Sequence, residues 1–268
     1  MRAVTPPDEH DMTKVTGVAV TSLLHLDSSA NRSDESVTRQ LTRLFAETWQ
    51  CLYGQAGYRY RDLAVEPAPP IDTAYCALGR RSERYGVVPL AKVDALIDNQ
   101  AEETTWALTR PLIDELVSSQ TVLIGAPMYN YTLPAALKAW IDRVSFPGAL
   151  VDPSSRTRVL RNTKVVIVTS RGGAYGPGTP REGWDYETPY LREYFTKHGV
   201  RDLHVITRRA DLGQPGPAPR GPARAGGTVP RRSPRRGRGG SPRRGQGARR
   251  AGVGAAARAE VEAAGASG

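Results

Sequence analysis

Residues 127–131, Pro-Met-Tyr-Asn-Tyr, carry the side chains with the clearest potential for binding chemistry. They follow the apolar run 121–126 and precede an amphipathic segment over 134–144, a pattern that predicts a strand, a turn and a helix. The turn offers two phenol rings, one side-chain amide and free backbone N–H groups, which suit a flat heteroaromatic ligand better than a metal ion or a sugar. The candidate binding residues here are Met128, Tyr129, Asn130 and Tyr131.

A hydroxyl-rich segment follows the first predicted strand. Residues 28–36 read Ser-Ser-Ala-Asn-Arg-Ser-Asp-Glu-Ser, and a helix is expected to begin near Ser36. Hydroxyls and the free N–H groups of a helix N-terminus form an anion site that needs no lysine. The segment lacks the GxxxxGK[ST] and GxGxxG patterns, so a phosphate monoester fits better than a nucleoside triphosphate or a dinucleotide. A segment of this kind standing alone is more often a simple capped turn.

A third loop, Ser170-Arg171-Gly172-Gly173, follows the apolar run 165–169. Its two glycines allow backbone N–H groups to approach a ligand closely, although a Gly-Gly pair by itself usually marks a turn. All three loops follow strands of one predicted parallel sheet. They should therefore project from the same edge, where open α/β sheets bind their ligands, and this coincidence favours a binding site.

The order of elements that must position these loops is alternating. Strands are predicted over 18–26, 58–63, 121–126, 165–169 and 203–206, with helices between them, so the expected fold is α/β with a doubly wound, five-stranded parallel sheet. The first helix is predicted to bury one apolar stripe. That stripe consists of Val37, Leu41, Leu44, Phe45, Thr48 and Leu52. Residues 67–100 read as a long excursion without clear elements, a length typical of functional loops.

Composition divides the chain into unequal parts. The whole chain has 37 Lys+Arg and 27 Asp+Glu. Residues 208–268 contain 14 Arg and 3 acidic residues, a net charge of +11. Residues 1–207 therefore keep 23 basic and 24 acidic residues, a net charge of −1. The high net charge therefore belongs to the Arg/Gly/Pro/Ala-rich tail, which lacks aromatic residues and is expected to be disordered. We expect an N-terminal extension over 1–17, one domain over 18–207 and a disordered basic tail over 208–268.

Several classes of protein are disfavoured by the residues present. Cys51 and Cys76 show no CxxC spacing and the four histidines form no ligand-spaced cluster, so we expect reduced thiols and no bound metal. The N-terminal residues do not resemble a signal peptide, and the sequence has no apolar run long enough to span a membrane. The expected location is therefore cytoplasmic.

The three loops, in this order and spacing, resemble those of the flavodoxin-like FMN-dependent NADH-azoreductase and NADH:quinone oxidoreductase family. The likeness covers residues 22–206 and extends to 133–142 and 187–191. It implies that Ser29, Asp34, Glu35 and Ser36 hold the FMN phosphate. It also implies that residues 128–131 line the isoalloxazine ring, and that Ser170, Arg171, Gly172 and Gly173 hold its pyrimidine edge. The family ends in a long strand and a helix, whereas here the pattern gives way to the atypical tail.

The resemblance implies an FMN enzyme that takes hydride from NADH or NADPH and passes two electrons to a quinone or azo acceptor, with ping-pong kinetics, as a homodimer. No general acid or base stands out in the sequence. One alternative is a flavodoxin-type one-electron carrier, but such carriers are strongly acidic and residues 1–207 are nearly neutral. A second is nucleic-acid binding through the Arg-Gly tail, which lacks stacking aromatic residues.

Overall fold

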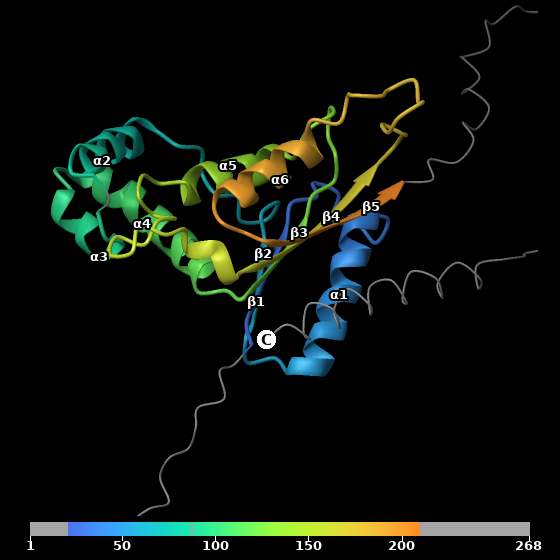
Figure 1. The fold of residues 1–268 in the computed structure, drawn as a ribbon, viewed down its shortest axis with the longest axis horizontal. Coiled ribbons are helices and arrows are strands. Elements are labelled where there is room, and N and C mark those ends of the chain that lie inside the picture. Colours follow the sequence, from blue (N-terminus) through green and yellow to red (C-terminus); the bar gives the residue numbers. More distant parts are fainter. Residues whose placement is uncertain (1–20, 87, 210–268) are drawn as a thin grey trace, which may run out of the picture.

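The computed structural model describes residues 21–86 and 88–209, and Figure 1 shows a central sheet with helices on both of its faces. The strands are β1 (Leu23–Asp27), β2 (Tyr58–Asp62), β3 (Thr121–Gly125), β4 (Lys164–Arg171) and β5 (Asp202–Arg209). The helices are α1 (Val37–Tyr53), α2 (Thr73–Arg84), α3 (Leu90–Val93), α4 (Gln100–Val117), α5 (Ala135–Val144) and α6 (Glu187–Lys197). Two 3-10 helices, η1 (Asp94–Leu96) and η2 (Val159–Asn162), complete these elements.

All five strands run parallel in the order β2-β1-β3-β4-β5. This confirms the predicted flavodoxin-like, five-stranded parallel sheet. The chain moves outward from β1 to β2 and then returns to place β3 on the other side of β1. The sheet therefore has a switch point between β1 and β3, the position at which ligands bind in open α/β sheets.

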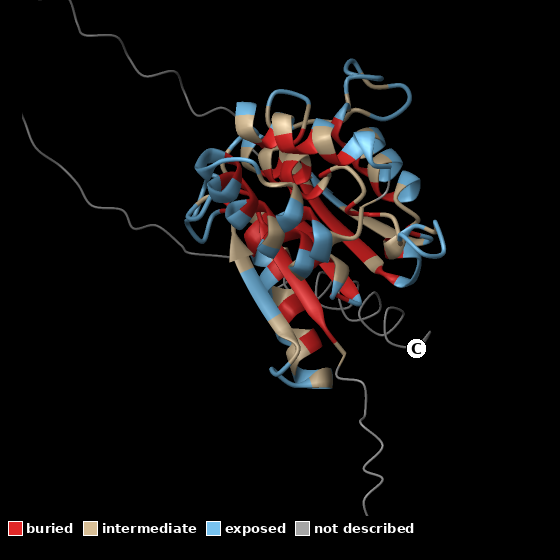
Figure 2. Ribbon diagram, turned by 90° about the vertical axis from the view of Figure 1, so that its left-hand side faces the viewer, coloured by how far each residue is buried: buried red, intermediate tan, exposed pale blue. Residues whose placement is uncertain are grey.

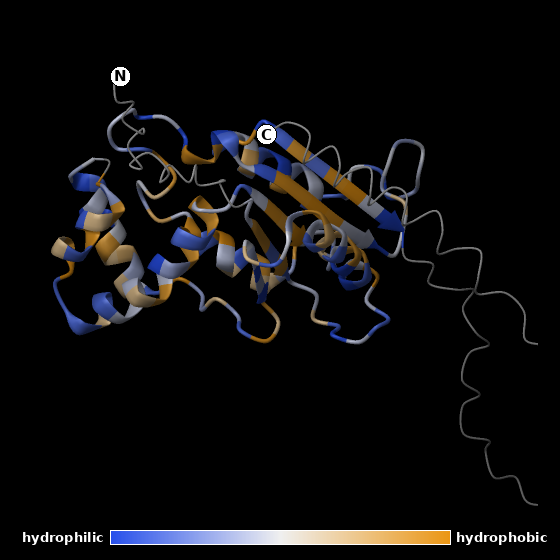
Figure 3. Cartoon of the chain, turned by 90° about the horizontal axis from the view of Figure 1, so that it is seen from below, coloured by the Kyte–Doolittle hydropathy of each residue, from blue (hydrophilic) through white to orange (hydrophobic). Residues whose placement is uncertain are grey.

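Alternate residues of each strand face opposite sides of the sheet. Leu24 and Leu26 of β1 belong to the larger apolar core, which they share with buried residues of α4, α5 and α6. Leu23 belongs to a smaller core on the other face, with Phe45 and Trp49 of α1. Figure 2 shows the central strands buried between exposed elements, and Figure 3 shows the apolar colour concentrated along these strands. Burial on both faces explains why these strands read as continuous apolar runs in the sequence.

The predicted apolar stripe of α1 is only partly correct, since Phe45 lies in the smaller core and Leu41 packs against it. Of its residues only Phe45 is buried, and Leu52 is 53% exposed. The buried residues are Thr38, Arg39, Thr42, Phe45, Ala46 and Trp49. The helix is rotated from the predicted position because Arg39 and Thr42 hydrogen-bond to Asp62 and Asp27 at the carboxyl ends of β2 and β1.

The excursion over 67–100 is not irregular, because it contains α2, α3 and η1. Arg143 of α5 is fully buried and fastens the start of this segment by donating hydrogen bonds to the carbonyl oxygens of Pro69 and Pro70. Tyr75 of α2 donates to the carbonyl oxygen of Asp142, 2.8 Å away. The segment packs against α4 and α5, and its predicted role as a functional loop has no support in these contacts.

The limits of the domain differ slightly from those expected. The predicted first strand starts at residue 18, whereas β1 starts at Leu23, and residues 18–20 lie outside the described part. The predicted boundary after residue 207 falls inside β5, which continues to Arg209. The predicted extension 1–17 and the tail from residue 210 lie outside the described residues. Within residues 21–86 and 88–209, no helix is long and apolar enough to cross a membrane.

Gly125 provides a direct test of packing at the end of β3. A Cβ atom there would lie 2.4 Å from the Asp27 carboxylate and 3.0 Å from the Thr42 methyl group. We expect Gly125→Ala to lower the free energy of unfolding by about 1–3 kcal/mol, as overpacking of a core does. Urea denaturation measures this change. Gly176→Ala is the control, since no atom lies within 4 Å of its Cβ position, and equal stability of both variants would contradict the packing described.

Candidate functional site

The three predicted loops lie together at the carboxyl edge of the sheet, because β3 pairs with both β1 and β4. Hydrogen bonds join them directly. The backbone N–H of Ala30 donates to the Tyr129 hydroxyl at 3.1 Å, and the N–H of Met128 donates to the carbonyl oxygen of Ser170 at 2.9 Å. The expectation that the loops share one edge is therefore confirmed.

The loop after β1 brings two serine hydroxyls together. The Oγ atoms of Ser29 and Ser36 are 3.0 Å apart, and both residues are buried. Ser36 is also the N-cap of α1, since its side chain accepts a hydrogen bond from the N–H of Arg39. Asp34 and Glu35 are exposed, and the Asp34 carboxylate lies 3.4 Å from the Arg43 guanidinium. An anion in this loop would therefore meet hydroxyl and N–H groups rather than the two carboxylates.

The loop after β3 is a tight turn with an unusual backbone. Tyr129 and Thr132 exchange N–H to carbonyl hydrogen bonds of 2.9 and 3.0 Å, and the two residues between them have φ values of 48° (Asn130) and 71° (Tyr131). Asparagine adopts the left-handed region readily, whereas tyrosine does so at a cost. Backbone strain of this kind concentrates at functional sites. It could not be expected from the residue types, since a turn with two positive φ values normally contains glycine.

The loop after β4 is held from both sides. Ser170 Oγ lies 2.7 Å from Thr38 Oγ1 of α1. Arg171 points to the other face, where its guanidinium donates to Asp185 at 2.6 Å and to Thr207 at 3.1 Å. Arg171 is therefore a paired residue, not a solvated surface charge. Gly172 is exposed, and a Cβ atom on Gly173 would meet the end of the Arg181 side chain at 3.0 Å.

Aromatic side chains that the sequence analysis did not select lie beside the β3 turn. The Tyr131 ring contacts Trp184 edge to face at a centroid distance of 5.3 Å and lies 6.2 Å from the ring of Tyr175. The N–H of Tyr186 donates to the carbonyl oxygen of Tyr131 at 3.0 Å. Trp184 is 48% exposed and Tyr186 is 61% exposed. The segment before α6 therefore adds exposed rings to the edge where the three loops meet.

Glu187, the first residue of α6, is a buried carboxyl beneath the β4 loop. It is 0% exposed, and it accepts a hydrogen bond of 2.6 Å from the Thr169 hydroxyl through Oε2. Its Oε1 atom is buried without a hydrogen-bond partner. Burial raises the pKa of Glu187 to about 8, with a further contribution from the Asp185 carboxylate, although the Thr169 hydrogen bond and Arg171 act in the opposite direction. Only the tertiary contact reveals this group, since the sequence shows an ordinary helix-start glutamate.

Glu187→Gln should remove a pH dependence of stability. Above the ordinary glutamate pKa of about 4.3, the Glu187 carboxyl loses its proton in the unfolded chain but keeps it in the folded protein. The free energy of unfolding of the wild type therefore falls as the pH rises toward 8, by at most about 1.4 kcal/mol per pH unit. Because a glutamine side chain does not titrate, the stability of the variant relative to wild type should increase from pH 5 to pH 8. Urea unfolding across this range measures the difference, and parallel curves would contradict the buried neutral carboxyl.

Comparison with known proteins gives the same fold. The chain matches the family described as "Flavodoxin-like fold" over residues 21–222. Among solved structures, an azoreductase from Bacillus anthracis superposes with a TM-score of 0.60 at 17% identity, covering 71% of this chain and 88% of that one. An FMN-dependent NADH-azoreductase from the same species, solved in complex with FMN, gives a TM-score of 0.59 at 16% identity, with coverage of 70% and 87%.

Curated relatives are more similar in sequence. The FMN-dependent NADH:quinone oxidoreductase of Nocardia farcinica is 38% identical over 187 residues, which are 69% of this chain and 82% of that protein. The protein of the same name from Kineococcus radiotolerans is 37% identical over 190 residues, or 71% and 83% of the two chains. The chain belongs to this family of flavodoxin-like FMN-dependent NADH:quinone oxidoreductases.

Proposed function

We propose that this protein binds FMN at the edge formed by the three loops and uses it to transfer two electrons from NADH or NADPH to quinones, and to cleave azo compounds reductively. The observation that carries the proposal is the joining of the β1, β3 and β4 loops by the Ala30–Tyr129 and Met128–Ser170 hydrogen bonds. The names of the relatives, FMN-dependent NADH:quinone oxidoreductase and azoreductase, support it.

The phosphate end of FMN fits the loop after β1. Ser29 and Ser36 provide hydroxyls, and the free N–H groups at the start of α1 provide further donors. Asp34 and Glu35, which lie next to Ser36, would contribute through their backbone, because a phosphate and two carboxylates repel each other. This refines the roles that the family resemblance implies for these residues.

The ring end fits the other two loops. Met128, Tyr129, Asn130 and Tyr131 would line the isoalloxazine, on a turn whose two central residues, Asn130 and Tyr131, have left-handed backbone. Ser170, Arg171, Gly172 and Gly173 would lie along the pyrimidine edge. Bound FMN supplies the hydride and electron chemistry, and the chain supplies binding and orientation. We assign no general acid or base.

The decisive experiment is a titration of FMN-free protein with FMN, followed by assays with NADH, a quinone and an azo dye. We expect a bound flavin spectrum, FMN rather than FAD after release of the cofactor, and turnover with both acceptors. Parallel lines in double-reciprocal plots would support the ping-pong scheme. Sedimentation of the active protein tests the homodimer that the family resemblance implies, and full activity of a monomer would count against it.

Asn130→Gly should weaken FMN binding about tenfold, which is the effect of losing one hydrogen bond of about 1–3 kcal/mol. Glycine accepts the φ of 48° at this position, so the turn itself should be preserved. Fluorescence quenching during FMN titration measures the affinity. Asn162→Gly is the control, since Asn162 is exposed and lies before β4, at the opposite end of that strand. Equal affinity of both variants would show that residues 128–131 form only a turn.

A chain that ends at Arg209 should retain FMN binding and turnover, because every proposed cofactor contact lies between Ser29 and Gly173. We propose on this ground that residues 210–268 are dispensable for FMN binding and turnover. Residues 210–268 contain 12 Arg and 3 acids, and this net charge of +9 should instead cause salt-sensitive adhesion to anionic surfaces. FMN content and turnover of the full and shortened chains, each normalised to folded protein, give the comparison. A soluble shortened protein unable to bind FMN would show that the tail contributes to the site.

A further inference from the structure

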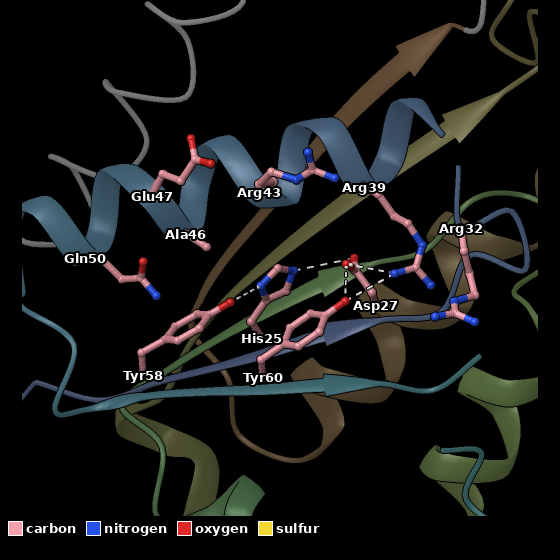
Figure 4. A pocket seen from close by; sticks show the side chains of 10 residues that line it. All are labelled: His25, Asp27, Arg32, Arg39, Arg43, Ala46, Glu47, Gln50, Tyr58 and Tyr60. Carbon is pink, nitrogen blue, oxygen red and sulfur yellow. Dashed lines mark hydrogen bonds and ion pairs between the residues drawn. The ribbon is translucent and has the colours of Figure 1, made fainter. Parts of the chain in front are cut away.

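A polar cluster lies between α1 and the carboxyl ends of β1 and β2. Most of it is buried, although Tyr60 is 48% exposed, and Figure 4 shows three of its members, Asp27, Arg39 and Tyr60. We call it the Arg39 cluster. It consists of Asp27, Arg39, Thr42, Tyr60 and Asp62. Three of its members, Asp27, Arg39 and Tyr60, line a cleft of about 380 Å³, together with residues that include His25, Arg32 and Arg43.

Arg39 makes the central contacts. Its guanidinium donates two parallel hydrogen bonds to the Asp62 carboxylate, of 2.9 and 2.8 Å. The Nη2 atom of Arg39, which makes the 2.8 Å bond to Asp62, also donates to the carbonyl oxygen of Ser29 at 2.9 Å. The side chains of Arg39 and Asp62 are only 9% and 15% exposed. One guanidinium therefore connects the phosphate loop after β1 to the end of β2, with the directionality of a bidentate pair.

Asp27 and Tyr60 complete the cluster. The Asp27 carboxylate accepts hydrogen bonds from Thr42 at 2.9 Å and Tyr60 at 3.1 Å, and it lies 3.5 Å from Arg39. Tyr60 also accepts a hydrogen bond of 3.2 Å from Arg39. Two carboxylates thus surround one guanidinium, so the positive charge of Arg39 is already compensated and offers little attraction to a phosphate above it.

Stability alone does not account for this arrangement. Removing a guanidinium and two carboxylates from water is costly, and well-packed apolar side chains of similar volume are often at least as stable. Position is the better explanation, since the cluster fixes one carbonyl group of the loop. A carbonyl oxygen turned toward a phosphate would repel it, whereas the Ser29 carbonyl is held by Arg39 on the side of α1.

We propose that Arg39 is a positioning residue, which holds the Ser29 carbonyl away from the phosphate so that the loop presents its hydroxyl and N–H groups instead. This inference rests on the proposed function, in which residues 29–36 hold the FMN phosphate. Asp62 positions the Arg39 guanidinium in turn.

The same strand offers a matched control. Arg61 of β2 forms an equally close two-bond pair with Glu115 of α4, at 3.0 and 2.6 Å, on the opposite face of the sheet. This pair has no contact with the loop after β1. Arg61→Gln therefore removes a comparable ion pair from β2 without touching the Ser29 carbonyl.

The experiment compares Arg39→Gln, Arg39→Lys, Asp62→Asn and Arg61→Gln in the full chain, with two measurements. The first is the FMN dissociation constant. We expect Arg39→Gln to raise this constant about tenfold, from the usual strength of a charged hydrogen bond, and Asp62→Asn to raise it by less. Arg39→Lys should restore part of the affinity lost in Arg39→Gln. Arg61→Gln should leave the constant unchanged. The second is amide hydrogen exchange of residues 28–36 in FMN-free protein, which should accelerate in Arg39→Gln but not in Arg61→Gln.

The two measurements separate the possible failures. Wild-type protein that does not bind FMN would refute the proposed function, while hydrogen exchange would still decide whether Arg39 orders the loop. Unchanged exchange in Arg39→Gln, or equal FMN affinity of wild type, Arg39→Gln and Asp62→Asn, would overturn the positioning role. If Arg39→Gln does not fold, Asp62→Asn, which preserves the shape of the cluster, gives the same decision.

Discussion

Parallel pairing of β3 with both β1 and β4 is the constraint on which the rest of this structure depends. Because parallel neighbours end at the same edge, segments far apart in the chain, at Ser29 and Ser170, meet around the β3 turn. A shift of one residue in either pairing would exchange the faces of the strand. It would turn Asp27 away from α1, or Ser170 away from Thr38. The register of the strands therefore determines which residues meet at the binding edge.

The elements and the converging loops could be predicted well from the sequence, because they depend on local patterns. The central strands are short β-branched or apolar runs, and Ser36 caps α1 as a hydroxyl residue before a helix normally does. Prediction failed where a polar residue is buried by a distant partner. Arg39 looks solvent-exposed in the sequence, yet its bond to Asp62 rotates α1 from the apolar stripe expected. The excursion over 67–100 was misread because α2 has few large apolar residues and the segment is fastened by the distant Arg143.

Burial of charged groups recurs through this fold and has different consequences at each place. Arg143 donates hydrogen bonds to the backbone carbonyls of Pro69 and Pro70, so it holds the segment before α2 against α5. Arg39 acts on the loop after β1, and Asp185 orients Arg171 after β4. Glu187 is different, since its remaining oxygen has no partner and the favourable state is the neutral one. Such groups limit which side chains can replace them more strictly than the apolar core does.

The hydrogen bond from the Tyr186 N–H to the Tyr131 carbonyl has a consequence for motion. It ties the segment before α6 to the strained β3 turn, and the contact of Trp184 with Tyr131 strengthens that tie. Neither segment can open without breaking the bond and separating the rings, so the two should open and close as one cooperative unit. Access to the loop edge is then governed by a single opening equilibrium, and any molecule that orders the turn also orders the aromatic segment beside it.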